Sequence, residues 1–109
     1  MGRSRRKVIL RPQADLDIDH QFEYLVVEAG VATARRFLRE LQKTCRSLQR
    51  SLELGSPRSF GDERLAGLRV WPVSGFRRQL VFYLPSAEAI EIVRVLHAAR
   101  DLEALLGDE

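Results

Sequence analysis

The chain has 109 residues, of which 45% are hydrophobic and 30% are charged, and its formal net charge is +3. This composition excludes a disordered or membrane-embedded chain and predicts a single domain over residues 1–109. The one cysteine, Cys45, excludes an internal disulfide, and the apolar runs are too short to predict a membrane partner. A reducing compartment suits such a chain, so we expect a cytoplasmic protein.

The charges lie in blocks along the chain. Residues 1–11 carry five bases and no acid, residues 12–28 carry five acids and no base, and residues 31–53 carry six bases and two acids. We expect residues 1–6 to form a flexible basic arm. The layout suits a polyanionic target on one face and a charged protein partner on another, and an ordinary solvated surface is the alternative.

Two helices are predicted in the first half of the chain. Residues 7–11 form a short β-type run, and Pro12 ends this run and suits the first turn of a helix. From there to Gly30, apolar residues recur at spacings of three and four: Ala14, Ile18, Phe22, Leu25, Val26 and Ala29. A second helix is predicted from about Ala32 to Leu52, with an apolar face of Ala34, Phe37, Leu38, Leu41, Cys45, Leu48 and Leu52. The short link predicts that the two helices pack as an antiparallel hairpin.

Strands are predicted in the second half of the chain. Residues 54–66 contain Gly55, Pro57 and Gly61 and are expected to form a loop. Strands follow at residues 68–73, 77–84 and 89–96, and the last is nearly all apolar and should be covered on both faces. Residues 101–106 predict a short closing helix. The order β-α-α-β-β-β-α predicts an α+β fold, with the helix hairpin packed on a largely antiparallel four-stranded sheet.

Four segments of the chain form a pattern in this order. They are residues 11–17 (RPQADLD), 34–41 (ARRFLREL), 67–69 (GLR) and 90–101 (IEIVRVLHAARD). Together they resemble the ParE/RelE superfamily of toxins from bacterial type II toxin–antitoxin systems, over roughly residues 7–105. The resemblance implies a toxin that a small cognate antitoxin neutralises by wrapping its C-terminal segment around it. It therefore implies a hetero-oligomer with that antitoxin.

The two branches of this superfamily imply different targets. ParE-like toxins are associated with poisoning of DNA gyrase, and RelE-like toxins cleave mRNA in the ribosomal A site. Cleavage through the 2′-hydroxyl needs a base, cations near the phosphate and an acid. In the segments comparable with the RelE-like enzymes, the catalytic candidates are His97, Arg69, Arg78, Tyr83 and Arg100. Of these, His97 is the one whose ordinary pKa lies near neutrality, which suits an acid or a base.

We favour the ParE-like branch, whose members are non-catalytic inhibitors. Residues 84–109 hold two bases, Arg94 and Arg100, whereas a nuclease that works inside the ribosome contacts many phosphates. The residues expected to bind the target are Arg69, Arg77, Arg78 and Arg100. The alternatives are a RelE-like mRNA endonuclease that acts on the ribosome, and a degenerate, non-toxic member that serves as a binding module.

A stripe of bases covers one face of the second predicted helix: Arg35, Arg39, Lys43, Arg46 and Arg50. We expect this stripe to meet an acidic antitoxin segment, and the other interpretations are a solvated face or a contact with nucleic acid or gyrase. The antitoxin would add a helix to the hairpin or a strand to the sheet edge. Two histidines and one cysteine give no metal-ligand spacing, and no glycine-rich phosphate loop occurs, so neither a metal nor a cofactor is expected.

Overall fold

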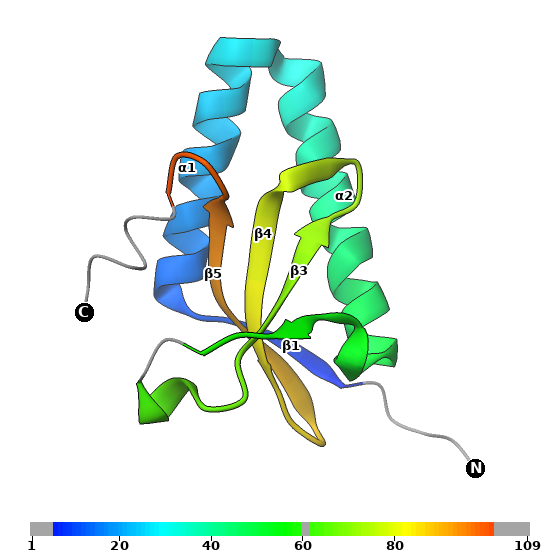
Figure 1. Cartoon of the computed structure of the whole chain (residues 1–109). Helices are drawn as coiled ribbons and strands as arrows, with labels where there is room; N and C mark the ends of the chain where they lie inside the picture. The colour runs from blue at the N-terminus through cyan, green and yellow to red at the C-terminus, as the bar shows by residue number, and fades with distance from the viewer. Residues whose placement is uncertain (1–5, 60–61, 102–109) are drawn as a thin grey trace.

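The computed structural model describes residues 6–59 and 62–101 (Figure 1). In chain order its elements are β1 (Lys7–Leu10), α1 (Pro12–Ala29), α2 (Val31–Arg50), β2 (Ser56–Pro57), β3 (Arg69–Val73), β4 (Phe76–Pro85) and β5 (Ala89–His97), with short 3-10 helices at Leu52–Leu54 and Glu63–Leu65. The two predicted helices and the α+β class are confirmed. Of the predicted closing helix, residue 101 lies in a turn, and residues 102–106 lie outside the described residues.

The strands form one sheet in the order β1-β5-β4-β3-β2. β1 runs parallel to β5, and the other neighbouring strands are antiparallel. The predicted strand number was one too low, because residues 56 and 57 pair with Val70 and Arg69. So short a strand has no periodic signal. Pro57 cannot donate a ladder hydrogen bond and is tolerated there because β2 lies at the edge of the sheet.

The two helices form an antiparallel hairpin that packs on the sheet (Figure 1). α1 begins at Pro12, whose missing N–H costs nothing in the first turn of a helix. Gly30 ends α1 and leads directly into α2, with a φ of 96° that a residue with a β-carbon adopts only at a cost. This glycine therefore sets the tight turn between the helices.

The buried face of α1 is more polar than predicted. Its buried residues are Ala14, Asp17 and Gln21. Asp17 is buried because it lies against the edge of β5, where β1 no longer covers that edge. β1 pairs with β5 only as far as Ile92. Beyond that point, the carboxylate of Asp17 accepts the backbone N–H of Val95 at 3.0 Å. A side chain of α1 thus satisfies a ladder hydrogen bond that the short β1 leaves open.

The buried apolar side chains form two clusters on the sheet. One cluster, which includes residues of α2, contains Phe37, Leu41, Leu48, Val81, Tyr83, Ile92 and Val95. The other cluster consists of Leu68, Phe82, Val93 and Leu96. Because β5 contributes to both clusters, the prediction that residues 89–96 are covered on both faces is confirmed.

Of the predicted basic arm, residues 1–5 lie outside the described residues. Arg6, the last residue of that segment, exchanges two hydrogen bonds with Gln49 of α2. Its guanidinium donates to the Gln49 carbonyl oxygen at 3.0 Å, and the Gln49 side-chain amide donates to the Arg6 carbonyl oxygen. Arg6 therefore ties the start of β1 to the C-terminal part of α2.

Candidate functional site

The first candidate site is a cavity of about 220 Å³ between α1, the N-terminal part of β4 and the end of β5. We call it the His97 pocket. Its lining residues are Tyr24, Leu25, Phe76, Arg77, Arg78, Gln79, His97 and Arg100. Three of these residues are arginines and none carries a carboxylate, so the surroundings of the pocket are positively charged. The structure thus gathers four of the predicted site residues in one place: Arg77, Arg78, His97 and Arg100.

The turn that follows β5 fixes the ring of His97. Its Nδ1 accepts hydrogen bonds from the backbone N–H groups of Ala99 (3.1 Å) and Arg100 (3.2 Å). The neutral ring therefore carries its proton on Nε2, which is a hydrogen-bond donor. Burial lowers the pKa of His97, and the charges of Arg100 and Arg78 lower it further, against the opposing effect of Asp101. His97 is consequently neutral near pH 7.

Arg100 is held in place by two residues of α1. Its guanidinium carbon lies 3.6 Å from the centre of the Tyr24 ring, in cation–π contact. Its Nη2 also donates to Oε1 of Gln21 at 2.9 Å, and the side-chain amide of Gln79 donates to the same oxygen at 3.2 Å. Sequence reasoning missed both glutamines, because buried polar residues leave no signal in a pattern of apolar positions.

Asp101 joins this network to the strand. Its carboxylate accepts the side-chain amide of Gln21 at 2.7 Å and the backbone N–H of His97 at 2.8 Å. Burial acts to raise the pKa of Asp101, but these two hydrogen bonds and the charge of Arg100 outweigh it, and the pKa lies below its ordinary value. The carboxylate is therefore ionised near neutral pH and anchors the turn to α1.

The other two predicted catalytic residues lie outside the His97 pocket. Arg69 pairs with Tyr83 across β3 and β4, whereas His97 pairs with Gln79 across β4 and β5. Their partners on β4, Gln79 and Tyr83, are four positions apart, which corresponds to about 13 Å along a strand. Arg69 donates from Nε to the carbonyl oxygen of Gly55 at 2.8 Å, so it helps to fix the segment before β2.

Tyr83 is fully buried and uses its hydroxyl for structure. The hydroxyl donates to the carbonyl oxygen of Leu52 at 2.7 Å and accepts the backbone N–H of Gly55 at 2.9 Å. Burial raises the pKa of Tyr83, against smaller opposing effects of the Gly55 hydrogen bond and of Arg69. The hydroxyl for which a catalytic role is predicted is thus shielded from solvent and engaged in two structural hydrogen bonds.

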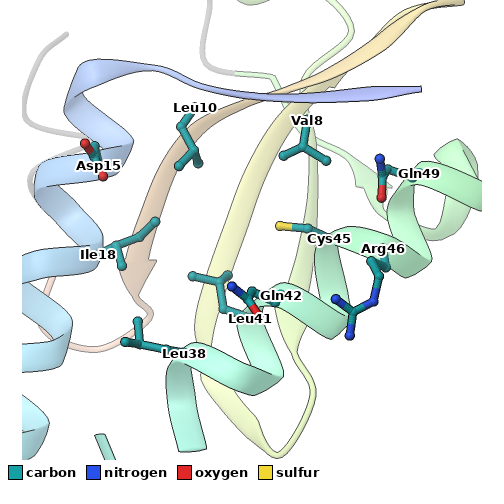
Figure 2. A pocket seen from close by; sticks show the side chains of 10 residues that line it. All are labelled: Val8, Leu10, Asp15, Ile18, Leu38, Leu41, Gln42, Cys45, Arg46 and Gln49. Carbon is teal, nitrogen blue, oxygen red and sulfur yellow. The ribbon is translucent and has the colours of Figure 1, made fainter. Parts of the chain in front are cut away.

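The second candidate site is a groove of about 500 Å³ between β1, the first turns of α1 and the C-terminal part of α2 (Figure 2). This end of the helix hairpin is the one far from the turn at Gly30. We call this site the open-end groove. Its apolar lining consists of Val8, Leu10, Ile18, Leu38, Leu41 and Cys45, and its polar lining of Asp15, Gln42, Arg46 and Gln49. In Figure 2, Val8 and Leu10 point from β1 into the space between the two helices. An apolar segment of a partner would fit such a surface.

β1 provides an open strand edge beside this groove. It pairs with β5 on one side, and no described residue pairs with its other side. The backbone N–H groups of Lys7 and Arg11 point toward β5, so those of Val8 and Leu10 point outward. The side chains of Val8, Ile9 and Leu10 are 38%, 46% and 44% exposed, which is unusual for three consecutive apolar residues.

The predicted stripe of bases on α2 is exposed along its whole length: Arg35, Arg39, Lys43, Arg46 and Arg50. Lys43 forms a salt bridge with Glu40 at 3.3 Å, and an exposed pair of this kind stabilises a helix only slightly. Arg46 also lines the open-end groove. The stripe and the groove therefore form one continuous surface.

Among residues 6–59 and 62–101, no group of three His, Cys, Asp or Glu side chains is placed to hold a metal ion. Neither helix of this part of the chain is long and apolar enough to cross a membrane. Burial raises the pKa of Cys45 to about 11, against a smaller opposing effect of Arg46, so its thiol is protonated near pH 7.

Solved structures with the same fold come from toxin–antitoxin systems. The chromosomal ParDE system of P. aeruginosa matches with a TM-score of 0.67 at 17% identity, over 84% of this chain and 95% of that chain. The YoeB dimer of Staphylococcus aureus matches with a TM-score of 0.56 at 15% identity, over 86% and 98%. The heterotetrameric YoeB–YefM complex of the same organism matches with a TM-score of 0.52 at 14% identity, over the same shares. The fold is therefore that of the small ParE/RelE-type toxins.

The sequence identifies the family within this class. A family model described as the ParE toxin of the type II toxin–antitoxin system parDE matches residues 8–102. The chain belongs to this ParE toxin family. No curated protein matches the chain in sequence.

Proposed function

We propose that the protein is a growth-inhibiting toxin that a cognate antitoxin neutralises by covering the open-end groove, the edge of β1 and the base stripe of α2. The observation that carries this proposal is the open edge of β1 beside an apolar groove. A partner strand would bind the outward backbone groups of Val8 and Leu10, and its apolar side chains would enter the groove. Acidic residues of the partner would bind Arg46 and the other bases of the stripe.

Co-purification tests the antitoxin proposal. The toxin is expressed with the product of the neighbouring reading frame, which carries an affinity tag. Val8→Asp places a charge in the groove and is expected to abolish co-purification. Leu16→Asp is the matched control, because Leu16 is an exposed residue of α1 that does not line the groove. Equal retention of both variants would exclude this docking surface.

For the target we propose DNA gyrase, bound through the bases of the His97 pocket. Membership in the ParE family and the dispersed catalytic candidates support this choice, because Tyr83 is buried and Arg69 lies on a different part of the sheet. Purified toxin is expected to block supercoiling by gyrase or to trap its cleavage complex. Arg78→Ala is expected to weaken this inhibition, and Lys43→Ala on α2 is the matched control. Supercoiling that continues at saturating toxin would contradict the proposal.

The alternative is a RelE-like mRNA endonuclease, which one observation supports. His97 is neutral near pH 7 and lies close enough to Arg78 and Arg100 for their charges to lower its pKa. An imidazole beside two cations suits proton transfer at a phosphate. The alternative predicts codon-specific cuts in a translating ribosome that His97→Ala abolishes while supercoiling by gyrase is unaffected.

A further inference from the structure

We infer that two copies of the chain associate through the outer face of the helix hairpin, with acids of α1 in each copy opposite the base stripe of α2 in the other. The acids are Asp15, Asp19 and Glu23, which we call the acid column. This contact is a second use of the surface proposed above to bind an antitoxin. Only its consequence for the antitoxin rests on the proposed function.

The acid column and the base stripe lie on the same outer face of the hairpin. Asp15, Asp19 and Glu23 recur at intervals of four residues and are exposed, so they form one line along α1. This line points away from Ala14 and Gln21, which α1 buries. The base stripe is exposed in the same way on α2, whose buried residues pack on the sheet. Because the sheet covers the inner face of the hairpin (Figure 1), its outer face carries both sets of charges.

Neither set of charges is fully neutralised within the chain. Like charges four residues apart on a helix repel each other, as Asp15 and Asp19 do on α1 and Arg35 and Arg39 on α2. Among the described residues, no salt bridge joins an acid of the column to a base. The helix dipole favours Asp15 in the first turn of α1 and Arg50 in the last turn of α2, but it does not favour the charges between the ends. A partner with the opposite pattern relieves both repulsions.

A second copy carries this opposite pattern at matching levels. Gly30 joins the two helices directly, so residues equally far before and after it lie level with each other. Asp19 and Leu41 are each eleven positions from Gly30 and are therefore level. The bases on either side of that level are Arg39 and Lys43, which Asp19 of the other copy faces in the dimer.

The charges also select the symmetry of the dimer. A two-fold axis parallel to the helices places α1 of each copy over α2 of the other and preserves the levels. A two-fold axis across the helices, in the same plane, places α1 on α1 and α2 on α2, where like charges repel. We therefore assign the parallel axis, with the two sheets on the outside of the dimer.

The dimensions of the hairpin predict a weak dimer that depends on salt. α1 has 18 residues and is about 27 Å long, and two helices about 10 Å apart present a face about 20 Å wide. Such a face buries roughly 500 Å² of each copy, which is near the lower limit for a specific complex. Isolated surface ion pairs contribute little, but here the three acids of each copy form a network with the bases of the other. Salt screens such a network.

The dimer covers the base stripe of the free protein. If an antitoxin binds the same bases, as proposed above, it must displace the second copy. Self-association then weakens the apparent affinity of the antitoxin as the concentration of free toxin rises. Addition of purified antitoxin is expected to replace the dimer by a toxin–antitoxin complex without the contact between hairpins.

Sedimentation velocity of the purified chain, without antitoxin, tests the dimer. We expect a reversible dimer at an ionic strength of about 50 mM, and a dissociation constant at least about tenfold higher at about 500 mM. Asp19→Lys and Lys43→Asp each bring like charges together and are each expected to weaken association at least about tenfold. Glu88→Lys is the matched control for Asp19→Lys, because it changes the net charge equally at an exposed position between β4 and β5. It should leave association within about twofold.

The double variant Asp19→Lys with Lys43→Asp distinguishes this interface from other modes of association. Both copies then carry the exchanged charges, so opposite charges face each other again and most of the lost affinity should return. A chain that stays monomeric at low ionic strength overturns the inference. So does a double variant that associates no better than the single variants, or a Glu88→Lys variant that loses association as they do. Association through the edge of β1 would be insensitive to all these changes and would also overturn it. Because the antitoxin is absent, failure of the dimer is distinguishable from failure of the proposed function.

Discussion

Asp17 of α1 binds the guanidinium of Arg94 on β5 with both carboxylate oxygens, at 2.7 Å and 3.0 Å. The same carboxylate accepts the backbone N–H of Val95. The side chains of the pair are 5% and 18% exposed, so solvent screens them little. Asp17 thus fixes α1 against β5, whose last residue lines the His97 pocket.

Removal of the Asp17 charge is expected to destabilise the fold strongly. Asp17→Asn removes the carboxylate charge that binds the guanidinium of Arg94 and the backbone N–H of Val95, which costs about 3 kcal/mol in the free energy of unfolding. Glu91→Gln is the control, because Glu91 pairs with Arg11 at 2.7 Å with both side chains more than a third exposed. That substitution is expected to cost less than about 1 kcal/mol. Urea unfolding measures both, and equal losses would contradict the assigned role of Asp17.

Tyr83→Phe is expected to lower stability and to leave toxicity intact. The substitution leaves the buried N–H of Gly55 and the carbonyl of Leu52 without the phenol, at a cost of roughly 1–3 kcal/mol. Tyr24→Phe is the control, since it keeps the ring that contacts Arg100 and should change stability by less than about 0.5 kcal/mol. Growth arrest on expression and urea unfolding are the two measurements. Loss of toxicity in a Tyr83→Phe protein that is still folded would restore a functional role for this hydroxyl.

The stability of the protein is expected to decrease as the pH falls below the ordinary pKa of histidine. The pKa of His97 in the folded protein lies below its ordinary value of 6.5, so the unfolded chain binds a proton more readily. The contribution is fully present above pH 6.5 and is lost as the pH falls through the folded-state pKa. Asp101 acts in the same direction, but its window lies below 3.8.

Urea midpoints measured between pH values of about 5 and 7.5 test this prediction. We expect His97→Gln to flatten the pH dependence across this window. His20→Gln, on the exposed surface of α1, is expected to keep it. A pH dependence that persists in His97→Gln and disappears in His20→Gln would contradict the prediction, because it would show that His20 and not His97 causes it.

The thiol of Cys45 is expected to report the state of the open-end groove. Its pKa of about 11 makes the reactive thiolate scarce at neutral pH, so a thiol reagent should label the folded protein roughly a hundredfold more slowly than the unfolded chain in urea. An antitoxin seated in the groove should slow labelling further. Labelling at an unchanged rate in the complex would show that the partner leaves the groove open.

The sequence was informative where local patterns decide the structure. Helical spacing predicted the second helix and its buried Phe37 and Leu48, and the apolar run of residues 89–96 predicted the doubly covered strand. The same method placed Phe22 and Val26 on the buried face of α1, although they are only half-buried in the structure. Apolar periodicity cannot register that Asp17 is required at the edge of β5, because that requirement arises from a strand far away in the sequence.

The candidate site was predictable in composition and only partly in arrangement. Arg77 and Arg78 precede Gln79 on β4, and His97 lies opposite Gln79 on β5, so pairing of the predicted strands brings them together. The burial of Tyr83 was not predicted, because a strand alternates its side chains between two faces, and the helices cover the face that Tyr83 shares with Val81. Which face of a strand is covered depends on the packing of distant elements, and no local pattern reports it.

The open edge of β1 has a consequence for the free protein. A strand with unpaired outward N–H and C=O groups and exposed apolar side chains can pair with another copy of the chain as readily as with an antitoxin. At the opposite edge of the sheet, Pro57 hinders such pairing because it lacks an N–H. Among the described strands, β1 is therefore the edge to which a further strand can be added. The antitoxin would then also act as a chaperone that prevents aggregation. Substitutions at Val8 or Leu10 that evade the antitoxin would alter solubility at the same time, which limits the routes by which a toxin can escape its inhibitor.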